Sequence, residues 1–481
     1  MKATRKKSVP AAILAALLCM LPACREPSIP PSDPSTSAIT LPEAPAPDDS
    51  DCTADIHTFG AASCLLPATC TLCGETAGDA LGHSMIPESP VLPTCTLSGS
   101  QRLTCARCNT TETVELAATG HIHGPGFCLT CGAPVENAIK NVILIIGDGM
   151  GQEHITAGER VYGENFAFTE WIQVSSATNS LDENGYATAL TDSAASGTAL
   201  ATGVLTENGR VGVDRDGNEL ETILDFAKDL GKSTGVLSTA PLYDATPATF
   251  SAHAVSRDDT YHLVMSQIRS GVDFLAGTTD THCTTYARNI QKRGYTYVTD
   301  MESAYAHIED DMLYCQLDLE GRFHGEDAVK LADAAVMAID FLDKDEDGFV
   351  LMIEQAHIDD YSHFNEFDGV VNMVKSLDET VDAVMAWVGD RTDTVVIITA
   401  DHETGGLCVT NQASILANSY PCNNGDTVYY SFQSTDHTET DVGLYLYGAA
   451  FDFSTLPFFG SSHVIKNSDV PSIIRQLLTH K

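Results

Sequence analysis

The feature that most constrains the fold is a series of short apolar runs that alternate with longer amphipathic segments after residue 140. The first run, Asn141–Gly147, reads NVILIIG and is typical of a strand buried on both faces. Similar strand-like runs are predicted at residues 233–239, 348–354, 394–401 and 442–447. Helices are predicted at residues 219–230, 258–270, 327–342 and 369–388. This alternation predicts an α/β fold with a largely parallel sheet.

Acidic residues stand at the ends of three of these predicted strands. Asp148 follows the first strand, Glu354 ends the third, and Asp401 ends the fourth. In parallel sheets, ligands gather beyond the carboxyl ends of the strands. Carboxylates that meet at one sheet edge repel one another unless cations hold them together. The pattern therefore predicts a cation site at this edge.

Three histidines lie close in the sequence to acidic residues or to a predicted strand of this sheet. Asp359 and His363 are four residues apart, so they share one face if that segment is helical. His402 directly follows Asp401, and His437 precedes the last predicted strand. A single histidine is usually an ordinary polar residue, but here that reading requires several independent coincidences. Mixed imidazole and carboxylate ligands suit zinc, and an all-oxygen set suits magnesium.

A serine in the segment TDSAASGTA, residues 191–199, is the candidate nucleophile. Thr191 or Asp192 can cap a helix, which puts Ser193 in the first turn, near free backbone N–H groups that favour an anion. A serine hydroxyl is a weak nucleophile until a base or a metal activates it. No Gly-x-Ser-x-Gly segment surrounds Ser193, which disfavours a hydrolase of the Ser-His-Asp type.

Taken together, the motifs resemble those of the alkaline phosphatases. They occur in the family's order from Asn141 to the C-terminus, and the resemblance does not extend to residues 1–140. The matching segments are GDGMG at 147–151, TDSAA at 191–195, DATP at 244–247, SR at 256–257, Glu354 with Asp359 and His363, TADH at 399–402, and HT at 437–438. The resemblance implies a three-layer α/β sandwich at residues 137–481.

The resemblance also implies an activity and a role for each matched residue. The expected reaction hydrolyses small phosphomonoesters through a phosphoserine intermediate on Ser193, with two Zn²⁺ and one Mg²⁺. Arg257 resembles the phosphate clamp, and Asp192 the carboxylate that steadies it. The expected metal ligands are Asp359, His363 and His437 for the first zinc, Asp148, Asp401 and His402 for the second, and Asp148, Thr246 and Glu354 for magnesium.

Two acidic residues bear on the third metal. Asp360 stands beside Asp359 where family members carry a lysine or a histidine, and Asp244 precedes Thr246. We expect this added negative charge to favour a hard cation and to weaken the binding of phosphate. The acidic run at residues 343–348 resembles the start of a calcium loop with Glu354 at its twelfth position. The apolar residues that follow it favour a surface turn that enters a strand.

Other functions are consistent with parts of the sequence. A phosphodiesterase of the same superfamily would keep the zinc ligands, but Thr246, Glu354 and Arg257 resemble the monoesterase set. A sulfatase is disfavoured because no Cys/Ser-x-Pro-x-Arg segment exists. With 26 Lys and Arg against 66 Asp and Glu, the net charge of −40 excludes general nucleic-acid binding. A function of another class is that of a surface-binding protein whose cysteine repeats carry the main role. An oligomer is consistent with the sequence.

The N-terminus predicts export. Residues 1–24 have a basic start and a short apolar run, as in a signal peptide, and end in LPAC. That ending resembles a bacterial lipoprotein cleavage box and predicts a lipid anchor at Cys24, although an ordinary signal peptide also fits. Residues 25–51 hold seven prolines among polar residues and predict an extended tether.

Residues 52–136 form a cysteine-rich region with an internal repeat. Nine cysteines lie between Cys52 and Cys131, and each complete unit supplies three cysteines and one histidine. The units are His57, Cys64, Cys70 and Cys73; His83, Cys95, Cys105 and Cys108; and a truncated third with His121 or His123, Cys128 and Cys131. Structural zinc and disulfides both fit this pattern. A structural or adhesive role is expected.

Four cysteines follow this region. An exported chain permits disulfides, so nearest neighbours are predicted to pair as Cys283–Cys315 and Cys408–Cys422.

Overall fold

The structure is a computed structural model that describes residues 57–95, 97–116, 118, 139–322, 324–325, 327–410, 412–413, 417–448 and 464–479. The predicted signal peptide, lipidation site and tether lie outside these residues. The chain divides into two compact units, Met1–Glu88 with Arg102–Thr113, and Ser89–Gln101 with Val114–Lys481. No helix in the described ranges has the length and apolar character needed to cross a membrane.

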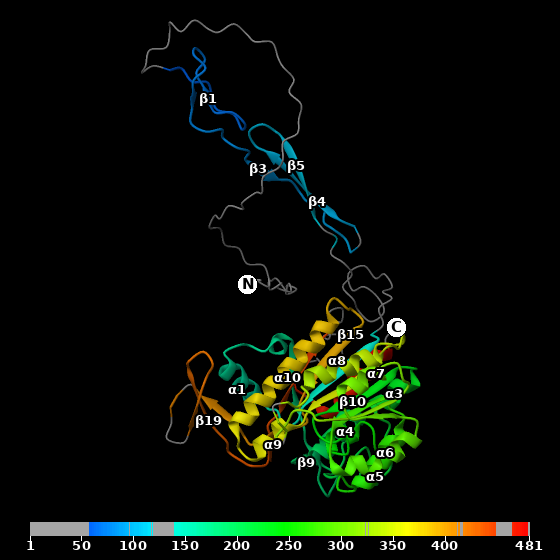
Figure 1. The fold of residues 1–481 in the computed structure, drawn as a ribbon. Helices are drawn as coiled ribbons and strands as arrows, with labels where there is room; N and C mark the ends of the chain where they lie inside the picture. The colour runs from blue at the N-terminus through cyan, green and yellow to red at the C-terminus, as the bar shows by residue number, and fades with distance from the viewer. Residues whose placement is uncertain are drawn as a thin grey trace. The chain divides into compact units, whose positions relative to one another are not determined.

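The described part of the cysteine-rich region is built from short strands (Figure 1). Two form a hairpin and three form a second sheet in the order β3-β4-β5. Their bounds are β1 (Ala68–Thr69), β2 (Thr76–Ala77), β3 (Met85–Pro87), β4 (Gly99–Cys105) and β5 (Thr111–Leu116). In the first unit, the buried side chains among the described residues are Cys64, Cys70 and Cys105, whereas Leu65 and Leu66 are exposed. This region therefore has cysteines where a larger domain has an apolar core.

A ten-stranded sheet forms the centre of the second unit, in the order β12-β13-β11-β10-β14-β6-β15-β21-β7-β22. Its neighbouring strands are parallel except at β21, which runs antiparallel to both of its neighbours. The strands are β6 (Asn141–Gly147), β7 (Ile172–Ala177), β10 (Ser233–Ser238), β11 (Phe274–Thr278), β12 (Thr296–Val298), β13 (Leu313–Leu317), β14 (Phe349–Gln355), β15 (Thr394–Thr399), β21 (Val442–Tyr447) and β22 (Val464–Lys466). The predicted largely parallel sheet is confirmed.

Helices cover both faces of this sheet, which confirms the predicted three-layer α/β sandwich. Alternate residues of β6 enter two apolar clusters, Ile143 and Ile145 on one face and Val142 and Leu144 on the other. The first face carries α1 (Gln152–Tyr162), α8 (Leu331–Leu342) and α10 (Phe367–Val388). The other carries α3 (Ile223–Asp229), α5 (Thr260–Ser270) and α11 (Val470–Thr479). Figure 1 shows α8 and α10 side by side.

Shorter elements lie around the sheet. The helices are α2 (Ser193–Thr202), α4 (Ala245–Thr249), α6 (Thr281–Lys292), α7 (Met301–Ala306) and α9 (His357–His363), with short 3-10 turns at Ala167–Glu170 and Asn467–Asp469. The strands are β8 (Ser180–Leu181), β9 (Ala187–Ala189), β16 (Glu403–Thr404), β17 (Cys408–Thr410), β18 (Asn418–Pro421), β19 (Thr427–Ser431) and β20 (His437–Thr438). Residues 343–348 form the expected turn into β14.

The two predicted disulfides of this unit are wrong. Cys315, Cys408 and Cys422 are all free thiols. Strand β19 lies between β17, which carries Cys408, and β18, which precedes Cys422. Two inter-strand spacings of about 4.8 Å each separate the outer strands by about 9.6 Å. This distance exceeds the Cα separation of about 7 Å that a disulfide can bridge. Cys315 is fully buried in the apolar cluster that also contains α8, and this burial raises the pKa of its thiol.

Candidate active site

The three acidic residues at strand ends come from neighbouring strands. Strands β14, β6 and β15 are adjacent in the sheet, so their carboxyl ends bring Glu354, Asp148 and Asp401 to one edge. All three side chains are buried; Glu354 and Asp401 have no exposed surface, and Asp148 retains 6%. Gly149, which follows Asp148, has a φ of 73° and donates its backbone N–H to Asp401 Oδ1 at 3.2 Å. The chain therefore turns back sharply toward the neighbouring strand.

One group of possible metal ligands contains Asp359, His363 and His437. Asp359 and His363 are on α9, with Asp359 Oδ2 3.2 Å from His363 Nε2. His437 is on β20, and its Nε2 is 3.8 Å from Asp359 Oδ1. The other ring nitrogen of each histidine faces a backbone carbonyl, that of Thr435 for His363 and that of Thr191 for His437. These contacts point both Nε2 atoms toward Asp359.

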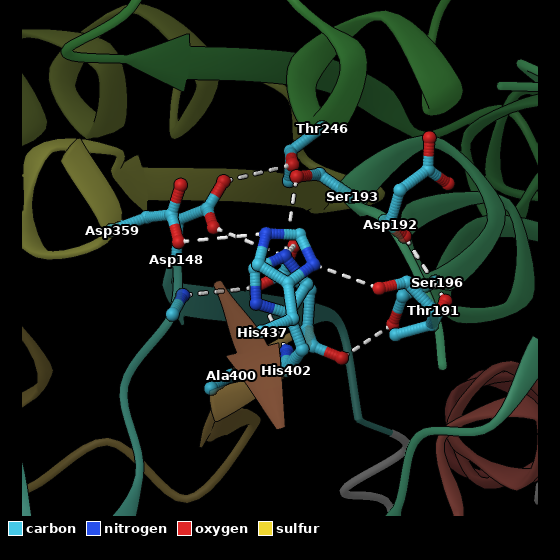
Figure 2. Close-up of polar contacts among 12 residues, drawn as sticks. Asp148, Thr191, Asp192, Ser193, Ser196, Thr246, Asp359, Ala400, His402 and His437 are labelled. Carbon is cyan, nitrogen blue, oxygen red and sulfur yellow. Dashed lines mark hydrogen bonds and ion pairs between the residues drawn. The ribbon is translucent and has the colours of Figure 1, made fainter. Parts of the chain in front are cut away.

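A second group contains Asp148, Asp359 and His402. His402 Nε2 lies 3.6 Å from Asp148 Oδ1 and 3.2 Å from Asp401 Oδ2. The same nitrogen is 3.2 Å from Ser193 Oγ (Figure 2). The rings of His402 and His437 are stacked 3.6 Å apart, so the two groups are neighbours. The candidate nucleophile therefore faces the donor atoms of the second group.

Asp148 also reaches a third set of oxygen donors. Thr246, on α4, donates its hydroxyl to Asp148 Oδ2 at 3.2 Å. Glu354 accepts a hydrogen bond from the hydroxyl of Ser238, at the end of β10. The hydroxyl of Thr246 thus contacts one oxygen of Asp148, whereas the other oxygen faces the imidazole of His402.

Ser193 is the first residue of α2, and Asp192 caps this helix. One carboxylate oxygen of Asp192 accepts from the backbone N–H of Ala195 at 2.9 Å. The other lies 3.4 Å from Arg257 Nη1, while Arg257 Nη2 lies 3.3 Å from Asp244 Oδ1. Asp192 thus links the capped helix to a guanidinium that is held between two carboxylates.

Burial and crowding set the charge of these groups. Burial and the charges of Asp401 and Asp359 raise the pKa of Asp148 well above its usual value. Burial raises the pKa of Glu354 to about 8. Burial lowers the pKa of His402, so its ring is neutral at pH 7. Burial opposes ionisation of Asp359, but the hydrogen bond from His363 and the nearby imidazoles hold its pKa below its usual range.

Unpaired buried oxygens indicate that this edge is suited to cations. Asp148 Oδ1, Glu354 Oε1 and Asp401 Oδ2 are buried and accept no hydrogen bond from the described residues. A buried charged oxygen without a partner costs free energy, and a metal ion removes that cost. The donor set, which combines carboxylates with neutral imidazole nitrogens, fits zinc on one side of Asp148 and magnesium on the other.

Two residues that contact the site, Thr404 and Ser238, were not predicted from the sequence. Thr404 donates its hydroxyl to Asp359 Oδ1, and its oxygen is 3.2 Å from His402 Nδ1. Ser238, the hydroxyl partner of Glu354, ends a predicted strand next to β14. Its place at the end of a predicted strand could have indicated that Ser238 lies at the same sheet edge as Glu354. Thr404 carries no such signal, because its place depends on the pairing of β16 with β20.

The acidic residues expected to add charge near the third metal both have partners. Asp360 Oδ2 lies 2.6 Å from Nδ1 of His357, and its side chain is 45% exposed. Asp244 contacts Arg257 and caps α4. Asp244 therefore offsets part of its charge on Arg257, and Asp360 is held in a hydrogen bond with His357.

The fold and the site are those of an α/β protein that binds metal ions. Its carboxylates and imidazoles meet at the carboxyl ends of the strands, where they can hold several ions. The family model described as alkaline phosphatase matches residues 139–273 and 279–454. The chain belongs to the alkaline phosphatase family.

Comparison with individual proteins supports the same family. The chain is 33% identical over 289 residues to alkaline phosphatase 4 of Bacillus subtilis, over 56% of this chain and 63% of that protein. It is 30% identical over 386 residues to alkaline phosphatase of Escherichia coli, over 65% of this chain and 82% of that protein. The alkaline phosphatase from the Antarctic bacterium TAB5 has a similar structure, with a TM-score of 0.61 and 25% identity over 72% of this chain and 99% of that one. The match thus spans less than two thirds of the Bacillus relative.

Proposed function

We propose that this protein is an exported, metal-dependent phosphomonoesterase that converts small phosphate monoesters to an alcohol and inorganic phosphate. The observation that carries the proposal is the position of Ser193. Its hydroxyl is at the start of a capped helix and 3.2 Å from His402 Nε2, the nitrogen that also faces Asp148 and Asp401. Backbone N–H groups at a helix N-terminus favour an anion such as a phosphoryl group.

The proposed reaction has two displacements. Ser193 Oγ attacks phosphorus, the bond from phosphorus to the ester oxygen breaks, and the alcohol leaves with a proton. A water molecule then attacks the phosphoserine, which restores the Ser193 hydroxyl and releases inorganic phosphate. Neutral His402 keeps its Nε2 lone pair directed at this region, and Asp192 holds the start of α2 in place. Arg257 presents a planar fork that fits two phosphoryl oxygens.

We propose two zinc ions and one magnesium ion as the cofactors. When bound, they supply the charge that lowers the pKa of the attacking hydroxyl groups and neutralises the phosphoryl oxygens. The proposed ligands are Asp359, His363 and His437 for the first zinc, Asp148, Asp401 and His402 for the second, and Asp148, Thr246 and Glu354 for magnesium. The unpaired oxygens of Asp148, Glu354 and Asp401 support this assignment.

A phosphodiesterase is the second candidate. The fork of Arg257 between Asp192 and Asp244 favours a monoester, because a second ester group removes one of the charged oxygens that a guanidinium binds. The test compares steady-state hydrolysis of a phosphomonoester and a phosphodiester by one preparation whose zinc and magnesium contents are measured. Faster turnover of the monoester is expected. Preferential turnover of the diester, or no hydrolysis by a metal-replete preparation, would contradict the proposal.

The remaining sequence predictions complete this proposal. We propose residues 137–481 as the catalytic domain and residues 52–136 as a structural or adhesive module. Export, the tether at residues 25–51 and the lipid anchor at Cys24 rest on the sequence alone. Mass spectrometry of the N-terminal peptide from the purified membrane fraction tests the anchor.

A further inference from the structure

We propose that Cys64, His83, Cys105 and Cys108 form a structural Zn²⁺ site that joins two consecutive repeats of the cysteine-rich region. This site is separate from the proposed phosphatase centre and does not depend on it. One ligand atom from each of the four residues lies within 4.8 Å of the others. Three thiolates and one imidazole are a complete ligand set for a tetrahedral structural zinc ion.

The distances between these atoms fit a metal site and not a disulfide. Cys64 Sγ lies 3.7 Å from Cys105 Sγ. Tetrahedral zinc with Zn–S bonds of about 2.3 Å places two sulfurs about 3.8 Å apart, whereas bonded sulfurs are about 2.0 Å apart. Cys108 Sγ lies 3.2 Å from His83 Nδ1, close to the sulfur–nitrogen edge of about 3.5 Å in the same geometry. All four residues are thus arranged around one point.

The Cys-x-x-Cys segment of this site has a turn that is repeated elsewhere in the region. The carbonyl of Cys105 accepts from the backbone N–H of Asn109 at 2.9 Å, and the carbonyl of Cys70 accepts from Gly74 at 3.0 Å. Asn109 and Gly74 both have positive φ, 58° and 79°. This conformation is uncommon for a residue other than glycine. The same turn in two different sequences indicates that the placement of the two cysteines is what both copies preserve.

The first repeat also brings a cysteine next to a histidine. Cys73 Sγ lies 3.4 Å from His57 Nδ1, as Cys108 does from His83. His57, Cys70 and Cys73 form a three-residue group of possible ligands. A disulfide framework has no use for a histidine at this position, whereas a zinc site needs it as a ligand.

The grouping differs from the one that the repeat alone suggests. Cys64 belongs to the first repeat by sequence, yet its sulfur joins the ligands of the second. A metal ion here therefore ties the two repeats together. Leu65 and Leu66, next to Cys64, are 75% and 66% exposed, so apolar burial contributes little at this point. In small modules with so little core, metal binding supplies much of the folding free energy.

Thiol reactivity of the full-length protein tests the site directly. Cys108 and Cys408 are both exposed free cysteines, so they form a matched pair. If zinc binds Cys108, iodoacetamide modifies Cys408 but not Cys108 in the native protein, and Cys108 becomes reactive after a chelator removes the metal. Peptide mass spectrometry reads both sites. Equal modification of both cysteines before chelation, or a Cys64–Cys105 disulfide in a non-reducing map, would overturn the proposal.

Metal analysis of variants provides the second arm. Cys105→Ser should lose one zinc per chain relative to the parent while it keeps phosphomonoesterase activity, and Cys408→Ser should lose none. His83→Cys should retain the zinc, since four thiolates also bind it. With Co²⁺ in place of zinc, His83→Cys should strengthen the thiolate-to-cobalt charge-transfer absorption and Cys105→Ser should weaken it. An unchanged zinc content in Cys105→Ser would refute the site. If that variant does not fold, the reactivity of the parent decides.

Discussion

The hydroxyl oxygen of Ser193 lies 3.2 Å from Nε2 of His402, although the two residues belong to a helix and a strand end that are far apart in the sequence. His402 is fully buried and neutral, and the same nitrogen faces Asp401 and Asp148. The proposed nucleophile and the donor atoms proposed for a zinc ion therefore converge on one position.

The first prediction follows from this contact. Ser193→Ala should lower phosphomonoesterase kcat by about a thousandfold or more, because it removes the only group proposed to bond with phosphorus. The zinc content should not change, since the proposed ligands remain. Thr202→Ala, at the other end of α2, is the control and should keep its activity. Substantial turnover by metal-replete Ser193→Ala would reject Ser193 as the nucleophile.

The second prediction concerns Arg257. Arg257→Lys should weaken inhibition by inorganic phosphate and raise KM by about 10- to 100-fold, because lysine keeps the charge but cannot contact Asp192 and the phosphoryl oxygens with a fork. Arg210→Lys is a matched control, since Arg210 forms a part-buried ion pair with Glu207. An unchanged phosphate inhibition constant would show that Arg257 does not bind phosphate.

The third prediction tests Thr404, which contacts both Asp359 and His402. Residues that orient metal ligands commonly contribute a factor of about 10 to 100 in metal affinity. Thr404→Val should therefore need more zinc for half-maximal activity and should recover kcat when zinc is in excess. Thr410→Val changes a threonine in β17 whose hydroxyl oxygen accepts a hydrogen bond from the backbone N–H of Gln412, and this variant should behave like the parent. Equal zinc dependence of both variants would count against this role.

The fourth prediction concerns stability and pH. His154 is fully buried beside Ser362, and burial lowers its pKa from 6.5 to about 4. The folded state thus resists protonation that the unfolded state accepts below pH 6.5. The resulting stabilisation is complete above pH 6.5 and is lost as the pH falls toward 4. It amounts to about 3 kcal/mol.

Urea unfolding of the parent and of His154→Gln measures this effect. The stability difference between the two proteins should move in favour of the variant as the pH is lowered from 7 to 4.5. The comparison removes pH effects that both proteins share, including loss of metal. A difference that stays constant over this range would show that His154 does not titrate as proposed.

Much of the architecture could be predicted because buried parallel strands have a strong local signal. The bounds predicted for β6 and β21 agree with the structure. Helix α3 begins later than the predicted residue 219, at Ile223, because the side chains of Thr222 and Asp225 form a capping box that fixes its start. The composition of the segment near residue 219 does not show that the helix begins only after Thr222.

Contacts that depend on tertiary pairing were harder to predict. The disulfide Cys408–Cys422 was predicted from proximity in sequence, but β19 separates the two strands. In the cysteine-rich region, the repeat showed which residue types are present, but it did not show that the Cys64 sulfur lies beside the possible ligands of the second repeat. In both cases the sequence spacing identified the cysteines but did not show which residues lie beside them in the folded chain.

The adjacency of β14, β6 and β15 also has a consequence for how the chain reaches its native state. Strand β6 pairs on both sides with segments that lie more than two hundred residues further along the chain. Its apolar residues must remain unpaired until those segments arrive, and such distant parallel pairing is slow. A nascent or partly folded chain therefore carries an exposed, aggregation-prone strand. The donor atoms meet only when this pairing is complete, so metal uptake should come late in folding and should trap the finished sheet.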